Sequence, residues 1–170
     1  VSSGDVNNCY NTGNVSAQSV SAMSFAGGVV GYLYSATVSN CYFLQDTDTS
    51  LSGIGYDNSS DNSSDTGAEP KTDDQFASGE VAYLLQAGQT AGEDSSTPQV
   101  WGQTLVGDTK DTTPVLTSDE TLSVVKVTFV AGDSEDARYT NSGKTVTLPS
   151  DPSAPATHAF CGWYTSRTEL

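Results

Sequence analysis

The sequence predicts a mainly β protein: a short β-solenoid capped by one α-helix, followed by a small and incomplete β-module. Three observations predict this class. A block at residues 4–10 returns at residues 36–42, after an interval of 32 residues. Within each period, Gly and Asn separate short β segments, which is typical of a coil of stacked repeats. Only residues 72–88 have the apolar spacing of a helix.

The composition favours an extracellular protein with a thin core. The chain has 35% hydrophobic residues and a formal net charge of −15, and its first 70 residues contain no Lys or Arg. This negative field repels phosphate backbones and anionic membranes, so we expect no nucleic-acid binding. No apolar run is long enough for a transmembrane helix, so we expect no direct membrane insertion. Because the chain begins inside a repeat, we expect it to continue into further domains of a larger protein.

Residues 1–56 form the predicted repeat region. The positions of its cysteines show whether the repeats are stacked. Cys9 and Cys41 occupy equivalent positions of successive repeats, so we expect them in the interior, about 4.8 Å apart. Either a buried thiol ladder or a disulfide fits this arrangement. The third cysteine, Cys161, makes the number odd, and the spacing of the three excludes a zinc site.

The other repeated residues predict the corners of the coil. Asn tolerates left-handed backbone conformations, so the repeated Asn is expected to form an amide ladder at a bend. The repeated Tyr follows the Cys and is expected to cover the side of the stack. Glycines relieve crowding where the backbone turns. The structural repeat residues predicted in this way are Asn8, Cys9, Tyr10, Asn40, Cys41, Tyr42, Gly27, Gly28 and Gly31.

Residues 57–71 are predicted to be a polar loop. Aspartates recur at positions 57, 61 and 65 among Ser and Asn, and little in the run can be buried. A calcium site is an alternative, but the run lacks the ligand order of an EF-hand loop. We therefore expect a solvated loop and no bound metal.

Residues 72–105 are predicted to hold a capping helix and a docking strand. Thr72 and Gln75 form a capping-box pattern, and Gly88 fits the position just past the helix end. The helix has one apolar face that needs a partner. The open end of the solenoid needs a cover, so we expect the helix there, with a strand around Trp101 docking beside it.

The last third of the chain predicts a linker and a second module. Residues 106–122 are polar and contain a proline, which is typical of a linker. In residues 123–170, strands are expected at residues 125–129, 145–148 and 160–164 because of their alternating or bulky apolar residues.

The repeat region resembles the GLUG-type repeats of bacterial surface proteins. The resemblance rests on GDVNNCYNTGNVS followed by AGGVVGYLYSATVSNCYFL, in which the glycines, the valine pair and Asn-Cys-Tyr come in the expected order. Ala36 stands where such repeats commonly have Gly. The resemblance covers about the first third of the chain and implies a repetitive β architecture in secreted or wall-associated proteins, with no catalytic residue.

The C-terminal part resembles the internalin-type (Listeria-Bacteroides) β-grasp-like repeat. Its markers are the opening Val-Thr-Phe strand, the element Thr-Val-Thr-Leu-Pro, and Phe-x-Gly-Trp-Tyr at residues 160–164. It departs at residues 131–133, where a glycine pair is more usual, and ends before the last strand of the family. The resemblance implies a partial β-grasp-like module.

The sequence offers little for catalysis, and we expect no enzyme and no cofactor. His158 is the only histidine, and its distance along a strand from Cys161 places the two side chains on opposite faces. Asp46 and Asp48 are the best pair of carboxylates for glycosidic-bond chemistry, but the repeat region has no basic residue and little groove for a sugar chain.

Two functions from different classes remain. The first is a non-catalytic stalk of a secreted or cell-wall-associated bacterial surface protein. The alternative is an adhesin-type module that binds a host glycan or protein through Tyr32, Tyr34 and Trp101. A fragment of a β-helical polysaccharide-active enzyme is a third alternative. A row of exposed aromatic residues would favour binding, and burial of these residues would favour the stalk.

Overall fold

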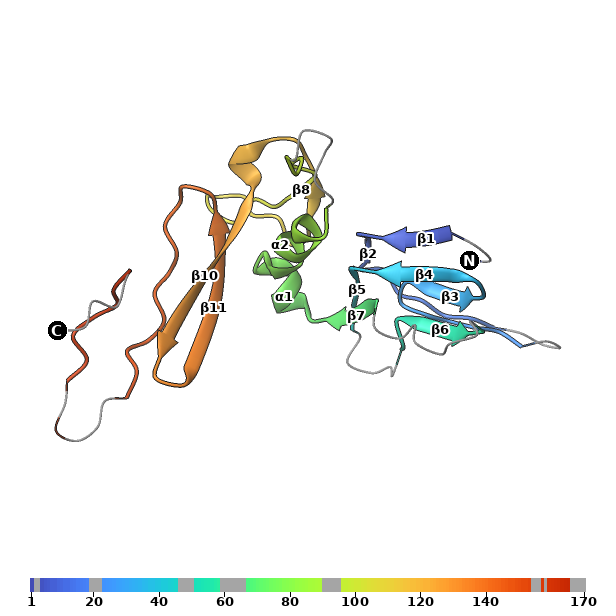
Figure 1. Cartoon of the computed structure of the whole chain (residues 1–170), viewed down its shortest axis with the longest axis horizontal. Coiled ribbons are helices and arrows are strands. Elements are labelled where there is room, and N and C mark those ends of the chain that lie inside the picture. The colour runs from blue at the N-terminus through green and yellow to red at the C-terminus, as the bar shows by residue number, and fades with distance from the viewer. Residues whose placement is uncertain are drawn as a thin grey trace.

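The structure is a computed structural model, and it describes residues 1, 4–18, 23–45, 51–58, 67–89, 96–153, 157 and 159–165. This part of the chain is mainly β, with the stacked strands at one end, two α-helices in the middle and a hairpin at the other end (Figure 1). The elements are β1 (Gly4–Asn7), β2 (Tyr10–Asn11), β3 (Val30–Leu33), β4 (Ala36–Ser39), β5 (Cys41–Leu44), β6 (Ile54–Asp57), β7 (Ala68–Lys71), α1 (Asp73–Ala77), α2 (Glu80–Ala87), β8 (Trp101–Gly102), β9 (Val115–Leu116), the 3-10 helix η2 (Glu120–Leu122), β10 (Val124–Ala131) and β11 (Ser134–Asn141).

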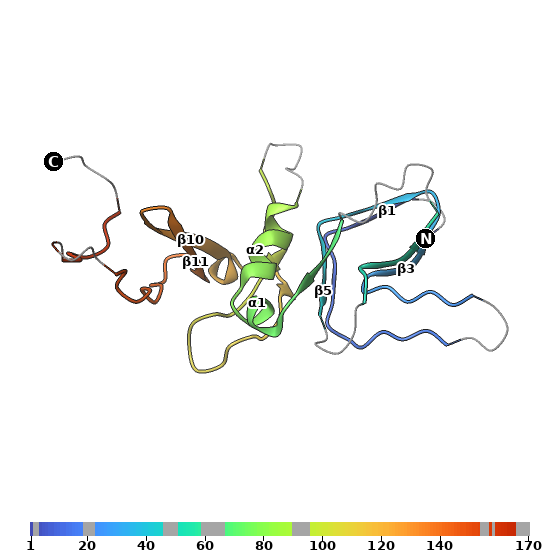
Figure 2. The same ribbon diagram turned by 90° about the horizontal axis from the view of Figure 1, so that it is seen from below.

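Parallel strands from successive repeats lie over one another. They form three sets, β1–β4, β3–β6 and β2–β5–β7. The two copies of the repeated block are in register, because Gly4 lies opposite Ala36 and Tyr10 lies opposite Tyr42. Seen from below, the three sets run along different sides of the stack (Figure 2). The predicted pairing of equivalent repeat residues is therefore present.

The interior of the stack is a narrow apolar core that depends on glycines around it. A Cβ atom on Gly27 would lie 2.1 Å from the Val30 carbonyl oxygen, and one on Gly28 would lie 2.3 Å from Cγ of Phe43. A Cβ on Gly31 would lie 2.9 Å from a backbone oxygen. The predicted relief of crowding thus holds for the three glycines, but Gly31 lies within β3 and not at a corner. The buried core residues are Val30, Leu33, Val38, Cys41, Ile54 and Ala68.

The range 57–71 is a loop only in part, which corrects the predicted boundary. Asp57 ends β6, and residues 68–71 form β7, which pairs with β5. Ala68 is small and apolar and enters the core, and Gly67 has no room for a side chain, since its Cβ would lie 1.6 Å from the Val38 carbonyl oxygen. The proline in β7 hid this strand from the sequence pattern. It is tolerated because β7 is at the edge of its sheet.

The predicted capping box is present, but the predicted single helix is broken. The Thr72 side chain accepts a hydrogen bond from the Gln75 backbone N–H, and the Gln75 side chain accepts one from the Thr72 N–H. α1 ends before Ser78, and α2 starts after Gly79, whose φ is +92°. A Cβ on Gly79 would also lie 2.5 Å from Leu105 Cδ1, so only glycine fits this turn.

The helices cover the side of the stack and not its open end, which corrects the predicted cap. They lie beside β5 (Figures 1 and 2). Their apolar residues meet Tyr10, Tyr42 and Leu44, which point outward from β2 and β5. The repeated tyrosines give this side an apolar face on which the helices pack. The buried residues of this junction are Tyr42, Phe76, Val81, Leu85 and Trp101.

The range 106–122 is folded against the rest of the molecule, which corrects its prediction as a linker. β9 lies in this range and pairs with β8 in an antiparallel ladder. Pro114 is buried, and its carbonyl oxygen accepts a hydrogen bond of 2.8 Å from the Tyr10 hydroxyl. The expected docking strand at Trp101 is therefore present as β8, and the chain after it returns to the stack.

The C-terminal part contains one hairpin in place of the three predicted strands. β10 includes the predicted strand 125–129, but residues 145–148 and 160–164 are not strands. Ser134–Asn141 forms β11, which its polar residues did not predict. The Asn141 side chain is buried and bonds to the backbone of Gln103 and Leu105. The hairpin is thus joined to the preceding elements, so position 123 is not a boundary between independent units.

Candidate functional site: an aromatic row on the stacked strands

Three aromatic side chains form a row on the outer surface of β3 and β6. Tyr32 and Tyr56 lie directly opposite each other on these parallel strands, and their rings stack with centroids 5.6 Å apart and an interplanar angle of 14°. The ring of Phe25 lies 4.7 Å from that of Tyr56 and 5.5 Å from that of Tyr32. We call Phe25, Tyr32 and Tyr56 the aromatic row.

Two glycines allow Phe25 to reach the tyrosines. A Cβ atom on Gly31 would lie 2.9 Å from the Phe25 carbonyl oxygen, and one on Gly55 would lie 2.4 Å from the Ala26 carbonyl oxygen. Because neither glycine has a side chain, the backbone of residues 25–26 can cross close to β3 and β6. The glycines next to the two tyrosines therefore help to build the row.

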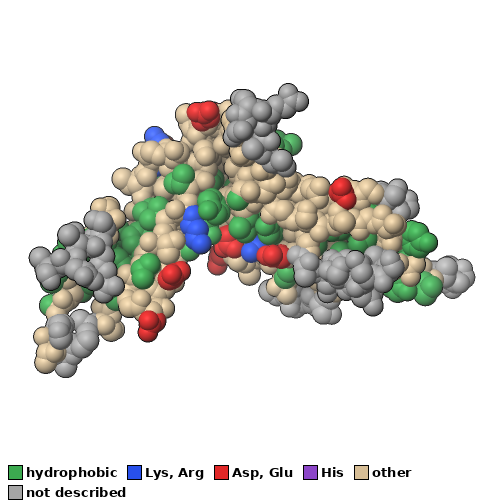
Figure 3. Space-filling view, in the orientation of Figure 1, with side chains coloured by type: hydrophobic (Ala, Val, Ile, Leu, Met, Phe, Trp, Pro, Cys, Tyr) green, Lys and Arg blue, Asp and Glu red, His purple; other side chains and the backbone are tan. Residues whose placement is uncertain are grey.

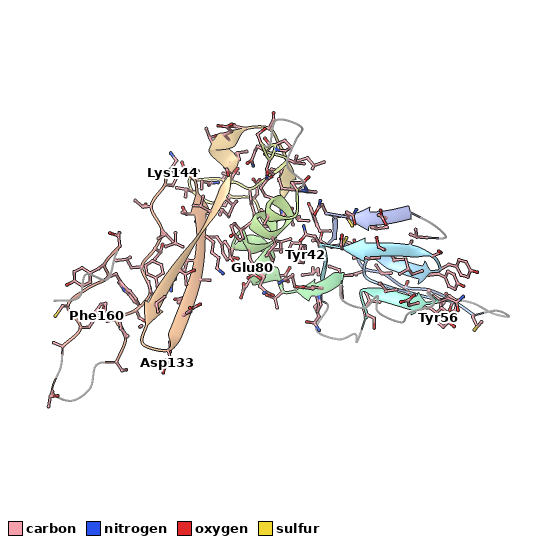
Figure 4. The ribbon with its side chains drawn as sticks, viewed as in Figure 1. Tyr42, Tyr56, Glu80, Asp133, Lys144 and Phe160 are labelled. Carbon is pink, nitrogen blue, oxygen red and sulfur yellow. The ribbon has the colours of Figure 1, made fainter. Side chains whose placement is uncertain are left out.

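The aromatic row is open to solvent. Tyr32 is 38% exposed and Tyr56 is 43% exposed, although each ring packs on its neighbours. The row lies at the end of the molecule away from the helices, as the position of Tyr56 shows (Figure 4). Apolar side chains are visible on the surface at this end of the stack (Figure 3). Met23, two residues before Phe25 in the sequence, is another exposed apolar side chain.

The charged side chains in the first 70 residues, which include the aromatic row, are all acidic. Residues 1–70 contain no Lys or Arg but six Asp residues and one Glu. An anionic ligand on the aromatic row would meet repulsion and would find no basic side chain from residues 1–70 to pair with. Lys71, at the end of β7, is already paired with Glu69 and Glu80. The surface suits a neutral ligand.

The three predicted binding residues have different positions. Tyr32 belongs to the aromatic row. Tyr34 is 53% exposed and follows the end of β3, and no ring contact joins it to the row. Trp101 is only 9% exposed and packs edge-on against Tyr10, so it is a core residue. The structure therefore does not bring the three together.

Sequence reasoning missed Phe25 and Tyr56. The signal for Tyr56 is the recurrence of an apolar residue, Gly and Tyr in residues 30–32 and 54–56, which lie in register. No signal in the sequence places Phe25, because it lies on the row only through the approach of residues 25–26 to the glycines.

The repeated Asn and Tyr residues form hydrogen bonds within the repeats and to α2. The Asn40 side chain donates to the Asn8 side chain at 2.5 Å and to the Leu84 carbonyl at 3.2 Å, as expected for an amide ladder. Tyr42 is buried beneath the helices and donates to the Asn40 side chain. Burial, and then the nearby Glu69 carboxylate, raises the pKa of Tyr42 to about 12. These residues join the repeats to α2.

Gly88 has the predicted place but a different reason for being glycine. It is the C-cap of α2, with a φ of −80° that any residue can adopt. A Cβ on Gly88 would lie 1.9 Å from the Asn40 side-chain nitrogen. The repeat asparagines therefore require glycine here.

No group of three or more His, Cys, Asp or Glu residues among the described residues is arranged to hold a metal ion. Asp46, Asp48, Asp61, Asp65 and His158, on which the alternatives of catalysis and calcium binding depended, lie outside the described residues.

A polar groove lies between the helices and β11. Its volume is about 1130 Å³, and its walls carry Asp74, Glu80, Lys110 and Arg138. The Arg138 guanidinium already forms an ion pair with the Asp136 carboxylate, at 3.0 Å. Charged side chains of both signs are visible in the notch below the helices (Figure 3). The mixed charges favour no single class of ligand.

Comparison of the chain with protein-family models, curated proteins and solved structures finds no match. In the part of the chain that is described, no helix has the length and apolar character needed to cross a membrane.

Proposed function

We propose that residues 1–71 are a short β-solenoid of GLUG-type repeats, and that the chain is a non-catalytic stalk region of a secreted or cell-wall-associated bacterial surface protein. The in-register parallel pairing of the two repeat copies supports the solenoid. The order of glycines, valines and Asn-Cys-Tyr supports the GLUG resemblance. On this proposal, the hairpin β10–β11 is part of an incomplete β-grasp-like repeat.

The same stalk is proposed to act as an adhesin-type binding module. One observation carries this function: Tyr32 and Tyr56 are stacked in register yet remain 38% and 43% exposed. A structural role alone would be better served by burying these rings, since each buried aromatic residue stabilises a core. A row of this kind favours binding over a spacer without a site.

Neutral host glycans are the proposed ligands. The apolar C–H faces of a pyranose ring can pack on an aromatic side chain, while its hydroxyls bond to water or to the tyrosine hydroxyls. The absence of Lys and Arg from residues 1–70 disfavours sialylated, sulfated or uronic-acid glycans. A host protein surface is the alternative occupant.

The test is binding of the full chain to an array that contains neutral and anionic glycans. We expect binding to neutral glycans, with a loss of at least tenfold in affinity for Tyr56→Ala, because one of the stacked rings is removed. Tyr34→Ala is the matched control, since it removes an exposed tyrosine that is outside the aromatic row. Circular dichroism checks that both variants fold.

The outcomes separate the two parts of the proposal. Binding that is lost in Tyr56→Ala and kept in Tyr34→Ala supports the adhesin function and its site. Binding that both variants keep would place the site elsewhere. Absence of binding by the folded chain to any glycan would leave the stalk, and preference for anionic glycans would contradict the charge argument.

A further inference from the structure

Cys9 and Cys41 are held side by side in neighbouring layers of the stack. Their Sγ atoms are 3.3 Å apart, and both are free thiols. The Tyr42 N–H donates to the Cys9 carbonyl at 2.9 Å, which fixes the two backbones next to each other. This contact does not depend on the aromatic row or on the proposed glycan binding.

The backbone arrangement suits a covalent bond between the two sulfurs. Tyr10 and Tyr42 are opposite each other on parallel strands, so the residues before them are opposite as well. Neighbouring strands are about 4.8 Å apart, which is within the range of about 4.4–6.8 Å that Cα atoms span in disulfides. Closing the gap to about 2.0 Å requires small movements of the two side chains and little movement of the strands.

The surroundings of the pair favour thiol chemistry. Cys41 is buried and donates to the Ser39 carbonyl at 3.1 Å, whereas Cys9 is only half-buried and donates to Cys41. This hydrogen bond from Cys9 lowers the pKa of Cys41 to about 7, and the same bond raises the pKa of Cys9. The lowered pKa of Cys41 favours the thiolate form of the pair, and a thiolate is the form that attacks a disulfide.

We propose that Cys9 and Cys41 are a reversible disulfide site that links the first two layers of the stack. The oxidant is a low-molecular-weight disulfide, such as oxidised glutathione. The proton that Cys9 donates passes along the hydrogen bond to Cys41, so that the more accessible Cys9 sulfur attacks the oxidant as the thiolate, forms a mixed disulfide and releases one glutathione thiolate. The second sulfur gives its proton to solvent and attacks the first, which releases the second glutathione. Two protein thiols are oxidised and one glutathione disulfide is reduced.

The link closes a loop that contains a whole repeat. Cys9 and Cys41 are separated by 32 positions, so the bond restricts the unfolded chain strongly. We expect the oxidised protein to have a Tm higher than that of the reduced protein by about 5 °C or more.

The test uses the full chain with Cys161→Ser, which removes the exposed third thiol. The protein is incubated at pH 8 with oxidised glutathione, and free thiols are counted by maleimide labelling and mass spectrometry. We expect the loss of both thiols, a peptide cross-linked through Cys9 and Cys41, and the rise in Tm. Dithiothreitol should restore both thiols and the lower Tm.

Two controls keep the result interpretable. In the wild-type chain, Cys161 should form a mixed disulfide with glutathione, which shows that the oxidant is active. Adding Cys9→Ser should abolish both the cross-link and the rise in Tm. Two free thiols after the oxidant has modified Cys161, or a cross-link that forms only in denaturant, would overturn the proposal.

Discussion

Asn8 and Asn40 combine a backbone role and a side-chain role at single positions. Both have left-handed backbone conformations, with φ of 52° and 49°, which Asn tolerates better than most residues. Their side-chain amides donate to the Gly88 and Leu84 carbonyls, respectively. The Gly88 carbonyl lies at the end of α2, where carbonyls lack partners within the helix, and Asn8 supplies one. Asn40 adds a second donor to the Leu84 carbonyl, which also accepts the Gly88 N–H.

Replacing Asn40 should therefore lower the free energy of unfolding by more than a typical substitution of a polar residue does. Asn40→Ala removes the bonds to Asn8 and Leu84 and places a Cβ residue without a polar side chain at positive φ. We expect a loss of about 3 kcal/mol in the free energy of unfolding, measured by urea denaturation. Asn40→Gly should lose about 1 kcal/mol less, because it tolerates the backbone conformation. Asn14→Ala, at an exposed position, is the control and should change stability little.

Tyr42 should make stability depend on alkaline pH. Its pKa is raised from 10.0 to about 12 in the folded protein, so between these values the unfolded chain loses the proton first. The stabilisation is complete below pH 10 and is lost as pH rises through 12, by roughly 2–3 kcal/mol. Denaturation at pH 9, 10 and 11 measures this slope. Tyr42→Phe should have a shallower slope, and equal slopes in the two proteins would contradict the assignment.

At the scale of elements, the junction between α2 and the side of the stack joins the repeats to the rest of the chain through a buried apolar cluster. Leu85 is fully buried there, against the side chains of Tyr42 and Trp101 among others. The Gln86 side chain adds a polar connection, because it accepts hydrogen bonds from the backbone N–H groups of Val100 and Trp101. The junction thus holds α2 and β8 together on β2 and β5.

A charge in this junction should separate the helices from the stack. Leu85→Asp would bury an unpaired carboxylate and remove the leucine contacts, so we expect a loss of about 4 kcal/mol or more in the free energy of unfolding. Ala87→Asp on the exposed side of the same helix is the control. The measurement is thermal and chemical unfolding followed by circular dichroism. Equal stability of the two variants would mean that the junction does not stabilise the protein.

Local patterns predicted some elements well and others poorly. The repeated block predicted which residues pair between strands, and Thr72 with Gln75 predicted the helix start. The break at Gly79 was missed because one glycine is compatible with a continuous helix. The features that require glycine here, a φ of +92° and the nearby side chains of Leu105 and Val124, come from the tertiary structure. β11 was missed because its polar side chains carry no apolar alternation, although its backbone pairs along the whole of β10.

At the scale of the whole molecule, the arrangement depends on contacts between distant residues that no local pattern records. Tyr10 bonds to Pro114, and Asn141 bonds to Gln103, so each segment returns to one that precedes it. Tyr32 could be predicted as a site residue from its type, but the aromatic row needs the packing of residues 25–26 on two strands. Trp101 is the opposite case. Its large aromatic side chain suggested a binding residue, but its neighbours in the fold bury it.

Asn141 should couple the hairpin to the helices. Its buried amide donates to the Gln103 carbonyl at 2.7 Å and accepts from the Leu105 N–H at 2.9 Å. Asn141→Ala leaves both groups without partners, so we expect hydrogen-exchange protection in β10 and β11 to fall by about tenfold or more. Protection in β5 should stay unchanged. Ser142→Ala, at the adjacent exposed position, is the control, and equal loss in both variants would contradict this coupling.

Because the helices lie at the side of the stack, repeats can be added at its ends. Within the described residues, β1 pairs only with β4 and β6 pairs only with β3, so neither outer edge is occupied by a helix. Duplication of one 32-residue period could add a layer beyond β1 without disturbing the contacts of α2. Each added layer would lengthen the stack by about 4.8 Å. Copy number could then vary the reach of the protein while its helical junction stayed the same.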